Sequence, residues 1–151
     1  MPAHWLQFVP FLVLSALMAV DELHYHRQRG LPLWERIGHP IDTAAFLAPI
    51  TFELMVEAGP VSSWIFFGLA TLSCLLVAKD EFVHRRECKG GEQLLHAYLF
   101  MVHPITLVSA YLLWPHMAQG GKFFSFPVPG SDPGRTFLTG FLIVTALFGI
   151  Y

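Results

Sequence analysis

The sequence predicts an all-α integral-membrane protein with about five transmembrane helices. Of its 151 residues, 54% are hydrophobic and only 13% are charged, whereas soluble domains carry about 25% charge. The hydrophobic residues gather in long runs without the period-2 alternation of strands. Helices satisfy their own backbone hydrogen bonds inside lipid. We therefore expect a single membrane domain, residues 1–151, in which two helical hairpins form a four-helix bundle and one extra helix follows at the C-terminal end.

Five apolar segments account for the predicted helices. They are residues 5–20, 43–58, 61–78, 94–114 and 136–151. A bilayer core about 30 Å thick requires about 20 helical residues. We therefore expect the first helix to continue to about residue 26 and the third to about residue 84. The segment 115–135 is rich in Pro, Gly and Phe and is predicted to be an outer loop. That loop either covers a cavity or simply connects two helices.

The basic residues predict the orientation in the membrane. Arg27, Arg29 and Arg36 follow the first apolar run, and four Lys and Arg residues fall within 79–89. Because cytoplasmic loops carry an excess of Lys and Arg, both polar segments are expected in the cytoplasm. The N-terminus is then outside.

The two polar segments also resemble each other. DELHYHRQRGLPLWERIGH covers residues 21–39, and DEFVHRRECKGGEQLLH covers residues 80–96. Each begins with Asp-Glu after an apolar run, continues with histidine, and ends in E-x-x-x-H. We interpret this as an internal repeat, with copies at about 5–58 and 61–114. Both polar segments lie on the same side of the membrane, which predicts a pseudo-twofold axis along the membrane normal that relates the two hairpins.

The duplicated motifs predict a metal site. Residues three or four apart share one face of a helix, so each copy would direct two carboxylate–imidazole pairs toward a common axis. Four-helix di-iron proteins use a similar set of Glu and His ligands. Any one of these motifs alone is equally typical of a solvated loop with salt bridges; it is the duplication that favours metal binding. The predicted ligands are Glu22, His26, Glu35, His39, Glu81, His84, Glu92 and His96.

Five further residues are left as additional ligands or as hydrogen-bond partners of the ligands: Asp21, His24, Asp42, Asp80 and His103. His24 and His26 cannot both share the face of Glu22, and the spacing favours His26. His103 precedes Pro104. It could bind metal, line a substrate path, or satisfy a carbonyl group freed by the proline.

The acidic content argues for cations at this site. Ionisable groups at membrane depth are costly and usually pair with one another or mark function. Several carboxylates together would repel each other, and two divalent metal ions would remove that conflict. Mixed imidazole and carboxylate ligands suit iron, zinc or manganese rather than copper(I) or iron–sulfur clusters. We expect two divalent ions, with iron favoured.

In its two polar segments the chain resembles the class of membrane-bound di-iron oxidases, desaturases and hydroxylases. The metal-binding histidine motifs of that class also lie at the cytosolic ends of membrane helices. The HxxxH and HxxHH boxes of that class are missing here, so no residue role is carried over. The resemblance implies oxidative chemistry on a lipid-soluble substrate. No flavin or nucleotide motif is visible, so a separate electron donor is expected.

Other functions remain open at the level of sequence. A zinc-dependent membrane lipid hydrolase would use Glu81 or Asp80 as a base and a metal-bound hydroxide. A non-catalytic metal-binding subunit of a larger membrane complex is a third possibility. A haem anchor is disfavoured, because a histidine pair would suffice for it. Membrane lipids are expected partners, whereas the net charge of -2 argues against nucleic acid.

Overall fold

The structure is a computed structural model that describes residues 4–30, 32–88, 90–117 and 132–150. Within these ranges it describes the backbone, but not the side chains, of residues 4, 29, 80–87 and 150. The described part is almost entirely helical and contains no strand. Its elements are η1 (His4–Phe8), α1 (Val9–Val20), η2 (Asp21–His26), α2 (Arg27–Arg29), α3 (Leu33–Met55), α4 (Pro60–Glu87), α5 (Gly90–Leu113), η3 (Trp114–His116) and α6 (Pro133–Ile150).

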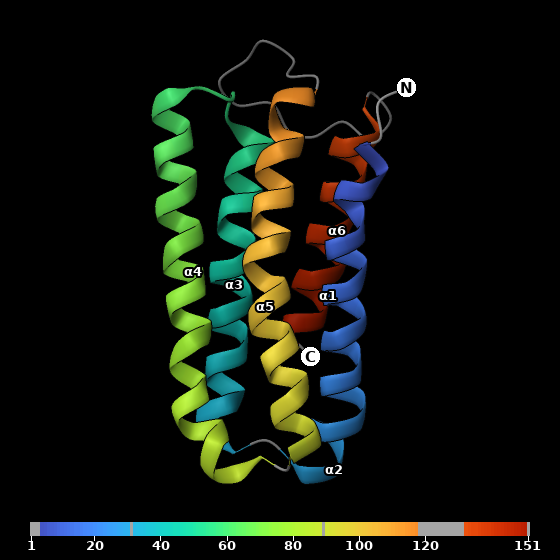
Figure 1. The fold of residues 1–151 in the computed structure, drawn as a ribbon, viewed down its shortest axis with the longest axis vertical. Coiled ribbons are helices and arrows are strands. Elements are labelled where there is room, and N and C mark those ends of the chain that lie inside the picture. The colour runs from blue at the N-terminus through green and yellow to red at the C-terminus, as the bar shows by residue number, and fades with distance from the viewer. Residues whose placement is uncertain (1–3, 31, 89, 118–131, 151) are drawn as a thin grey trace.

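The long helices lie side by side along the long axis of the molecule (Figure 1). The first four elements follow one another without a break and form one rod. That rod packs against α5, while α3 packs against both α4 and α6, and α4 also contacts α5. The α2–α3 and α4–α5 connections lie at the same end of the molecule, the lower end in Figure 1. The two polar segments therefore meet at one end.

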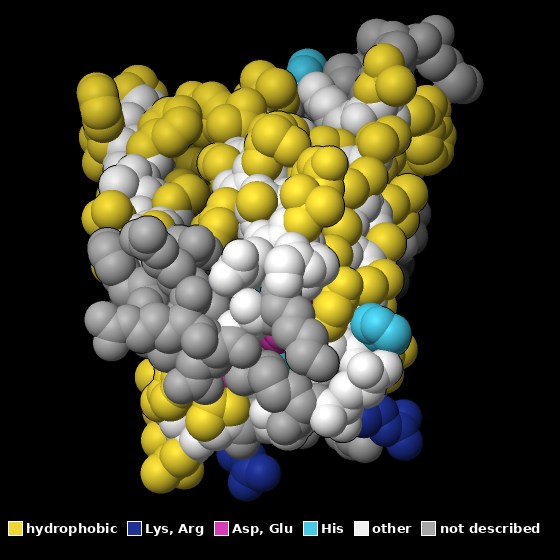
Figure 2. Space-filling model, turned by 60° about the horizontal axis from the view of Figure 1, so that its bottom comes forward, with side chains coloured by type: hydrophobic (Ala, Val, Ile, Leu, Met, Phe, Trp, Pro, Cys, Tyr) yellow, Lys and Arg dark blue, Asp and Glu magenta, His cyan; other side chains and the backbone are white. Residues whose placement is uncertain are grey.

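The helices surround an apolar core. Phe11, Ile50, Phe66, Leu107 and Leu138, from five different helices, are each no more than 2% exposed. Large apolar side chains also cover the outside; Figure 2 shows them over most of the upper part of the face drawn. A soluble monomer rarely exposes so continuous an apolar surface.

Three helical stretches of the described chain are long and apolar enough to cross a membrane. They are Trp5–His26, Pro60–Lys79 and Gly90–His116, and a shorter apolar helix covers Pro133–Gly149. The sequence predicts about five spans, so the structure supports this prediction in part. The second predicted span falls in α3, which carries the charged residues Glu35, Arg36, Asp42 and Glu53.

The helix boundaries differ most from the sequence prediction at α3. This helix begins at Leu33 instead of residue 43, directly after Pro32, whose extended backbone ends the preceding turn. The first rod continues past His26 to Arg29 and stops at Gly30, whose φ of 74° is readily adopted only by glycine. The acidic and histidine residues of the first polar segment are consequently helical and held in fixed positions.

The opposite end of α3 is capped by other helices. The Nε1–H of Trp114, a fully buried residue, donates to the Val56 carbonyl oxygen at 2.9 Å. The Arg135 guanidinium donates through Nη2 to the Leu54 carbonyl oxygen at 2.7 Å. The last carbonyl groups of a helix have no partner within the helix, so these side chains satisfy them. Residue 135 thus belongs to α6 and lies outside the predicted loop.

Candidate metal centre

The first polar segment enters the centre through a change in helix type. Residues Asp21–His26 form a π-helix, and the Arg27 N–H donates to the carbonyl oxygen of Glu22, five residues earlier. Short π-helical turns are often found at functional sites. This geometry places Asp21 and His26, which are five residues apart, together in the interior at 6% and 2% exposure.

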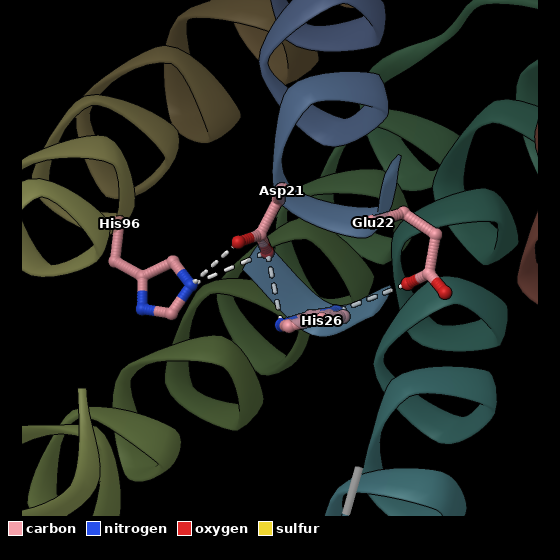
Figure 3. A network of polar contacts seen from close by, with 4 residues as sticks. All are labelled: Asp21, Glu22, His26 and His96. Carbon is pink, nitrogen blue, oxygen red and sulfur yellow. Dashed lines mark hydrogen bonds and ion pairs between the residues drawn. The ribbon is translucent and has the colours of Figure 1, made fainter. Parts of the chain in front are cut away.

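One group of potential ligands joins this turn to α5. Asp21, His26, Glu92 and His96 are all buried, and each offers one ligand atom within 4.8 Å of the others. Figure 3 shows Asp21 between the two imidazoles. The His96 Nε2 atom lies 3.2 Å from both carboxylate oxygens of Asp21, and the His26 Nε2 atom lies 3.4 Å from Oδ2. Metal–ligand bonds of about 2.0–2.2 Å keep ligand atoms of one ion within about 4.4 Å, so little adjustment is needed.

A second group joins the same turn to α3. His26, Glu35 and His39 also offer ligand atoms within 4.8 Å of one another. Glu35 is fully buried, and the rings of His26 and His39 meet at right angles with their centroids 4.7 Å apart. The two groups therefore share His26 and lie next to each other.

Glu22 contacts the shared histidine through the ring nitrogen that points away from Asp21. Its Oε2 atom lies 3.0 Å from the Nδ1 atom of His26 (Figure 3) and belongs to neither group. A metal-binding imidazole usually donates its other N–H to a carboxylate, which fixes the ring and its tautomer. The arrangement assigns this orienting role to Glu22 and leaves Nε2 of His26 for a metal.

We predict that Glu22→Gln lowers metal affinity without removing a ligand. Loss of such a supporting carboxylate typically costs about 10–100-fold in affinity, whereas saturating metal would still fill the site. Metal titration of the purified protein, before and after the substitution, measures the shift. Glu57→Gln, an exposed residue at the far end of the molecule, is the matched control. An unchanged affinity in Glu22→Gln would contradict the assigned role.

The remaining predicted residues lie in different surroundings. His24 is exposed, and its Nδ1 atom accepts a hydrogen bond from the Gln28 Nε2–H at 3.2 Å. Asp42 binds Lys79 of α4 at 3.1 Å. His103 is buried, and its Nε2 atom lies 2.9 Å from the hydroxyl group of Ser73. None of these three belongs to either ligand group. The side chains of Asp80, Glu81 and His84 lie outside the described residues.

The buried carboxylates need positive charge nearby. Asp21 and Glu92 lie within 4.8 Å of each other; two negative charges at that distance repel by about 3 kcal/mol at an effective dielectric constant of about 20. Protonated imidazoles or a bound cation would offset this cost. In the metal-free arrangement, the His96 Nε2–H donates to Asp21. A cation at Nε2 would displace that proton, which would move to Nδ1 of a neutral imidazole and leave the protein only from a protonated one.

A cavity of about 800 Å³ opens beside both groups. Asp21, His26, His39 and His96 line one part of it, and the other lining residues are mostly apolar side chains, with some charged and polar ones among them. Figure 2 shows acidic surface exposed through a gap near the lower end of the molecule. A ligand-sized space therefore adjoins the candidate centre.

Comparisons with known proteins found no relative from which a function could be inferred, so the function is inferred from this geometry. No family model matches the chain, and no curated protein and no solved structure matches it.

Sequence reasoning missed two features of the site. It paired Glu22 with His26, whose side chains do lie 3.0 Å apart, and left Asp21 open as a ligand or a hydrogen-bond partner. What it did not foresee is the π-helical turn, which brings Asp21 next to His26 in the first group. It also missed Ser73, which lies in an uncharged, mostly apolar run and contacts His103. One serine among several hydroxyl residues in such a run carries no signal in a single sequence, and a π-helical turn has no sequence signal either.

Proposed function

We propose that the chain is an integral-membrane protein that holds two divalent metal ions, preferably iron, and oxidises a lipid-soluble substrate. Three helical stretches with membrane-spanning length and apolarity support the membrane location. Of the Lys and Arg residues with described side chains, Arg27, Arg36 and Lys79 lie near the end that carries the ligand groups, and Arg135 lies at the other. This distribution supports a cytoplasmic centre and an outside N-terminus.

One observation carries the proposal: two ligand groups share a buried histidine beside a largely apolar cavity. Ionisable residues buried in this way rarely serve packing alone. The donors are imidazole and carboxylate without thiolate, a set that suits iron, manganese or zinc. The adjoining cavity gives an apolar molecule access to the same place.

The shared histidine sets a limit on how two ions can be held. One ring nitrogen of His26 contacts Glu22, so the other can serve a single ion. The second ion needs further donors, either from carboxylates that use both oxygens or from the second repeat. We propose that Glu81 and His84 supply them, as the repeat and its pseudo-twofold axis predict. Two such hairpins and α6 would make the bundle of four helices plus one.

The protein's own groups have distinct tasks in this scheme. Asp21, Glu35 and Glu92 balance the charge of the ions, and the histidines hold them while Glu22 orients His26. Burial excludes bulk water from the centre. Bound iron would supply oxygen activation, and electrons would come from a separate donor. The cavity holds the substrate near the ions, which is the positioning that the reaction requires.

A zinc-dependent lipid hydrolase is the second candidate, favoured by one specific observation. His26, Glu35 and His39 form a two-histidine, one-glutamate set, which is also a ligand set of catalytic zinc sites. In that case a metal-bound hydroxide would attack an ester in the cavity. A metal-binding subunit without catalytic activity would use the same ligands and would show metal without turnover.

Metal content tests the proposal directly. We expect about two ions per chain, mostly iron, when the protein is purified in uncharged detergent without chelator and analysed by elemental mass spectrometry. Stoichiometric zinc would favour the hydrolase instead. A chain that binds no divalent metal, even after titration with iron(II) and zinc, would overturn both candidates. A strong haem absorption band would also contradict them.

A further inference from the structure

The cavity beside the metal centre has a cationic rim. Arg27 on α2 and Arg36 on α3 both line it, close to the ligands His26 and Glu35 that precede them in the sequence. Within the described part of the chain, neither guanidinium group forms a hydrogen bond or an ion pair with another side chain. Two unpaired guanidinium groups at the mouth of one cavity are a ready site for an anion.

Most of the other residues that line the cavity are apolar. They include Leu14, Met18, Phe46 and Phe148, and polar residues such as Asp42, Thr43, His103 and Thr145 line it as well. Phe46 follows Arg36 by ten residues on α3, which at 1.5 Å per residue places it about 15 Å further along the helix. Leu14 lies similarly far from Arg27 on the first rod. The cavity therefore extends from a charged mouth into the apolar interior.

The ligand groups lie between these two ends. His39 and Asp21 line the cavity, and each is three to seven residues from the arginine or apolar residues on its own helix. The order along the cavity is thus guanidinium groups, candidate metal ligands, and apolar side chains. A molecule lying in it would meet the ions a short way from its polar head.

We propose that the cavity binds a single-chain amphiphile with an anionic head group, with the head at Arg27 and Arg36 and the chain directed toward Phe46. This assignment rests on the proposed function, because it names the substrate class of the same site. Arginine pairs with carboxylate and phosphate through two parallel hydrogen bonds. A neutral apolar molecule would leave both guanidinium groups without a role in binding. Asp21, Glu22 and Asp42 also line the cavity, and their negative charge makes an anion unfavourable here unless these arginines, and bound cations, offset it.

Three probes with the same hydrocarbon chain test the assignment. The metal-loaded full chain in uncharged detergent is titrated with palmitate, hexadecyl phosphate and hexadecanol, and binding is measured by calorimetry. We expect at least one anion to bind about ten-fold or more tightly than the alcohol, since hydrogen bonds from a guanidinium group to an anion are stronger than those to a neutral hydroxyl group. Whichever anion binds tighter identifies carboxylate or phosphate as the preferred head.

Two variants locate the binding. The double variant Arg27→Gln and Arg36→Gln is expected to reduce the preference for anions to less than about two-fold. Lys79→Gln removes one positive charge at the same end of the molecule, from a side chain that does not itself line the cavity. Because Lys79 pairs with the lining residue Asp42, its loss is compared with that in each single arginine variant, and Lys79→Gln is expected to keep most of the preference. Phe46→Trp narrows the inner end and is expected to weaken all three probes.

Several results would overturn the assignment. Equal affinity for the alcohol and both anions would remove the head-group site. If Lys79→Gln lost the preference for anions to the same extent, the preference would come from the general surface charge and not from a head-group site. If Phe46→Trp bound all three probes with full affinity, the hydrocarbon chain of the probe would lie outside the cavity. Metal content is measured on the same samples. A metal-loaded protein without anion preference refutes this inference alone, whereas a protein that cannot bind metal refutes the proposed function.

Discussion

Replacing His26 with alanine is expected to lower the metal content from two ions per chain to one or fewer. His26 is the single residue that both ligand groups contain. Its loss leaves the second group with only Glu35 and His39, and leaves the first with three donors around a new cavity. No other single substitution touches both groups. Elemental analysis of gel-filtered protein, loaded with excess iron(II), measures the change.

His24→Ala is the matched control for this experiment. His24 lies in the same π-helical turn but is exposed and outside both groups, so its loss is expected to leave metal content unchanged. Circular dichroism compares the helical content of both variants with that of the parent protein. A folded His26→Ala protein that still holds two ions would refute the shared-histidine arrangement.

Much of the fold could be predicted because apolar helices leave a strong pattern. The runs at 5–20, 61–78 and 94–114 all fall in helices that are long and apolar enough to cross a membrane. The pattern was weaker where charge interrupts it. The helix α3 includes Glu35 and Asp42 in its first turns, and the buried side of a helix next to a polar centre does not look apolar in the sequence. The apolar run at 43–58 therefore marks only the later part of α3, and its earlier part is indicated only by the four-residue spacing of Glu35 and His39.

Part of the site could be predicted because E-x-x-x-H spacing holds within an ordinary helix. Glu35 and His39 meet on α3, and Glu92 and His96 meet on α5, each within one ligand group. Periodicity along one helix cannot tell which helices face each other. That Asp21 lies against His96, 75 residues away, depends on how α1 and α5 pack. The same holds for the bond between Ser73 and His103.

Buried charge far from the centre was also hidden from sequence reasoning. Glu53 is 1% exposed at the opposite end of α3, and among the described residues neither of its carboxylate oxygens has a hydrogen-bond partner. An acidic residue near the end of an apolar run is expected to extend toward water. Here the packing of α6, with Arg135 bound to the neighbouring Leu54 carbonyl group, closes that route. Only the tertiary arrangement reveals this.

The two glutamates of the ligand groups are expected to control separate ions. Glu92 belongs only to the first group and Glu35 only to the second. Glu92→Ala and Glu35→Ala are therefore each expected to bind about one ion, and the double variant none. Glu57→Ala, an exposed glutamate at the other end of the molecule, is expected to keep both. A double variant that still binds two ions would contradict the site.

Thermal unfolding of the metal-free protein distinguishes the loss of a metal ligand from the loss of a group that stabilises the fold. Loss of a ligand leaves the melting temperature unchanged or raises it, whereas loss of a stabilising group lowers it. Without metal, the buried carboxylates repel each other, so removing Glu92 is expected to leave the melting temperature of the metal-free protein unchanged or raise it. With metal, the parent gains stability by RT ln(1 + [L]/Kd), about 4 kcal/mol at a thousand-fold excess over Kd, and the double variant gains none. If the double variant instead melts well below the metal-free parent, Glu35 and Glu92 stabilise the fold through hydrogen bonds to their histidines, and the buried acids are structural.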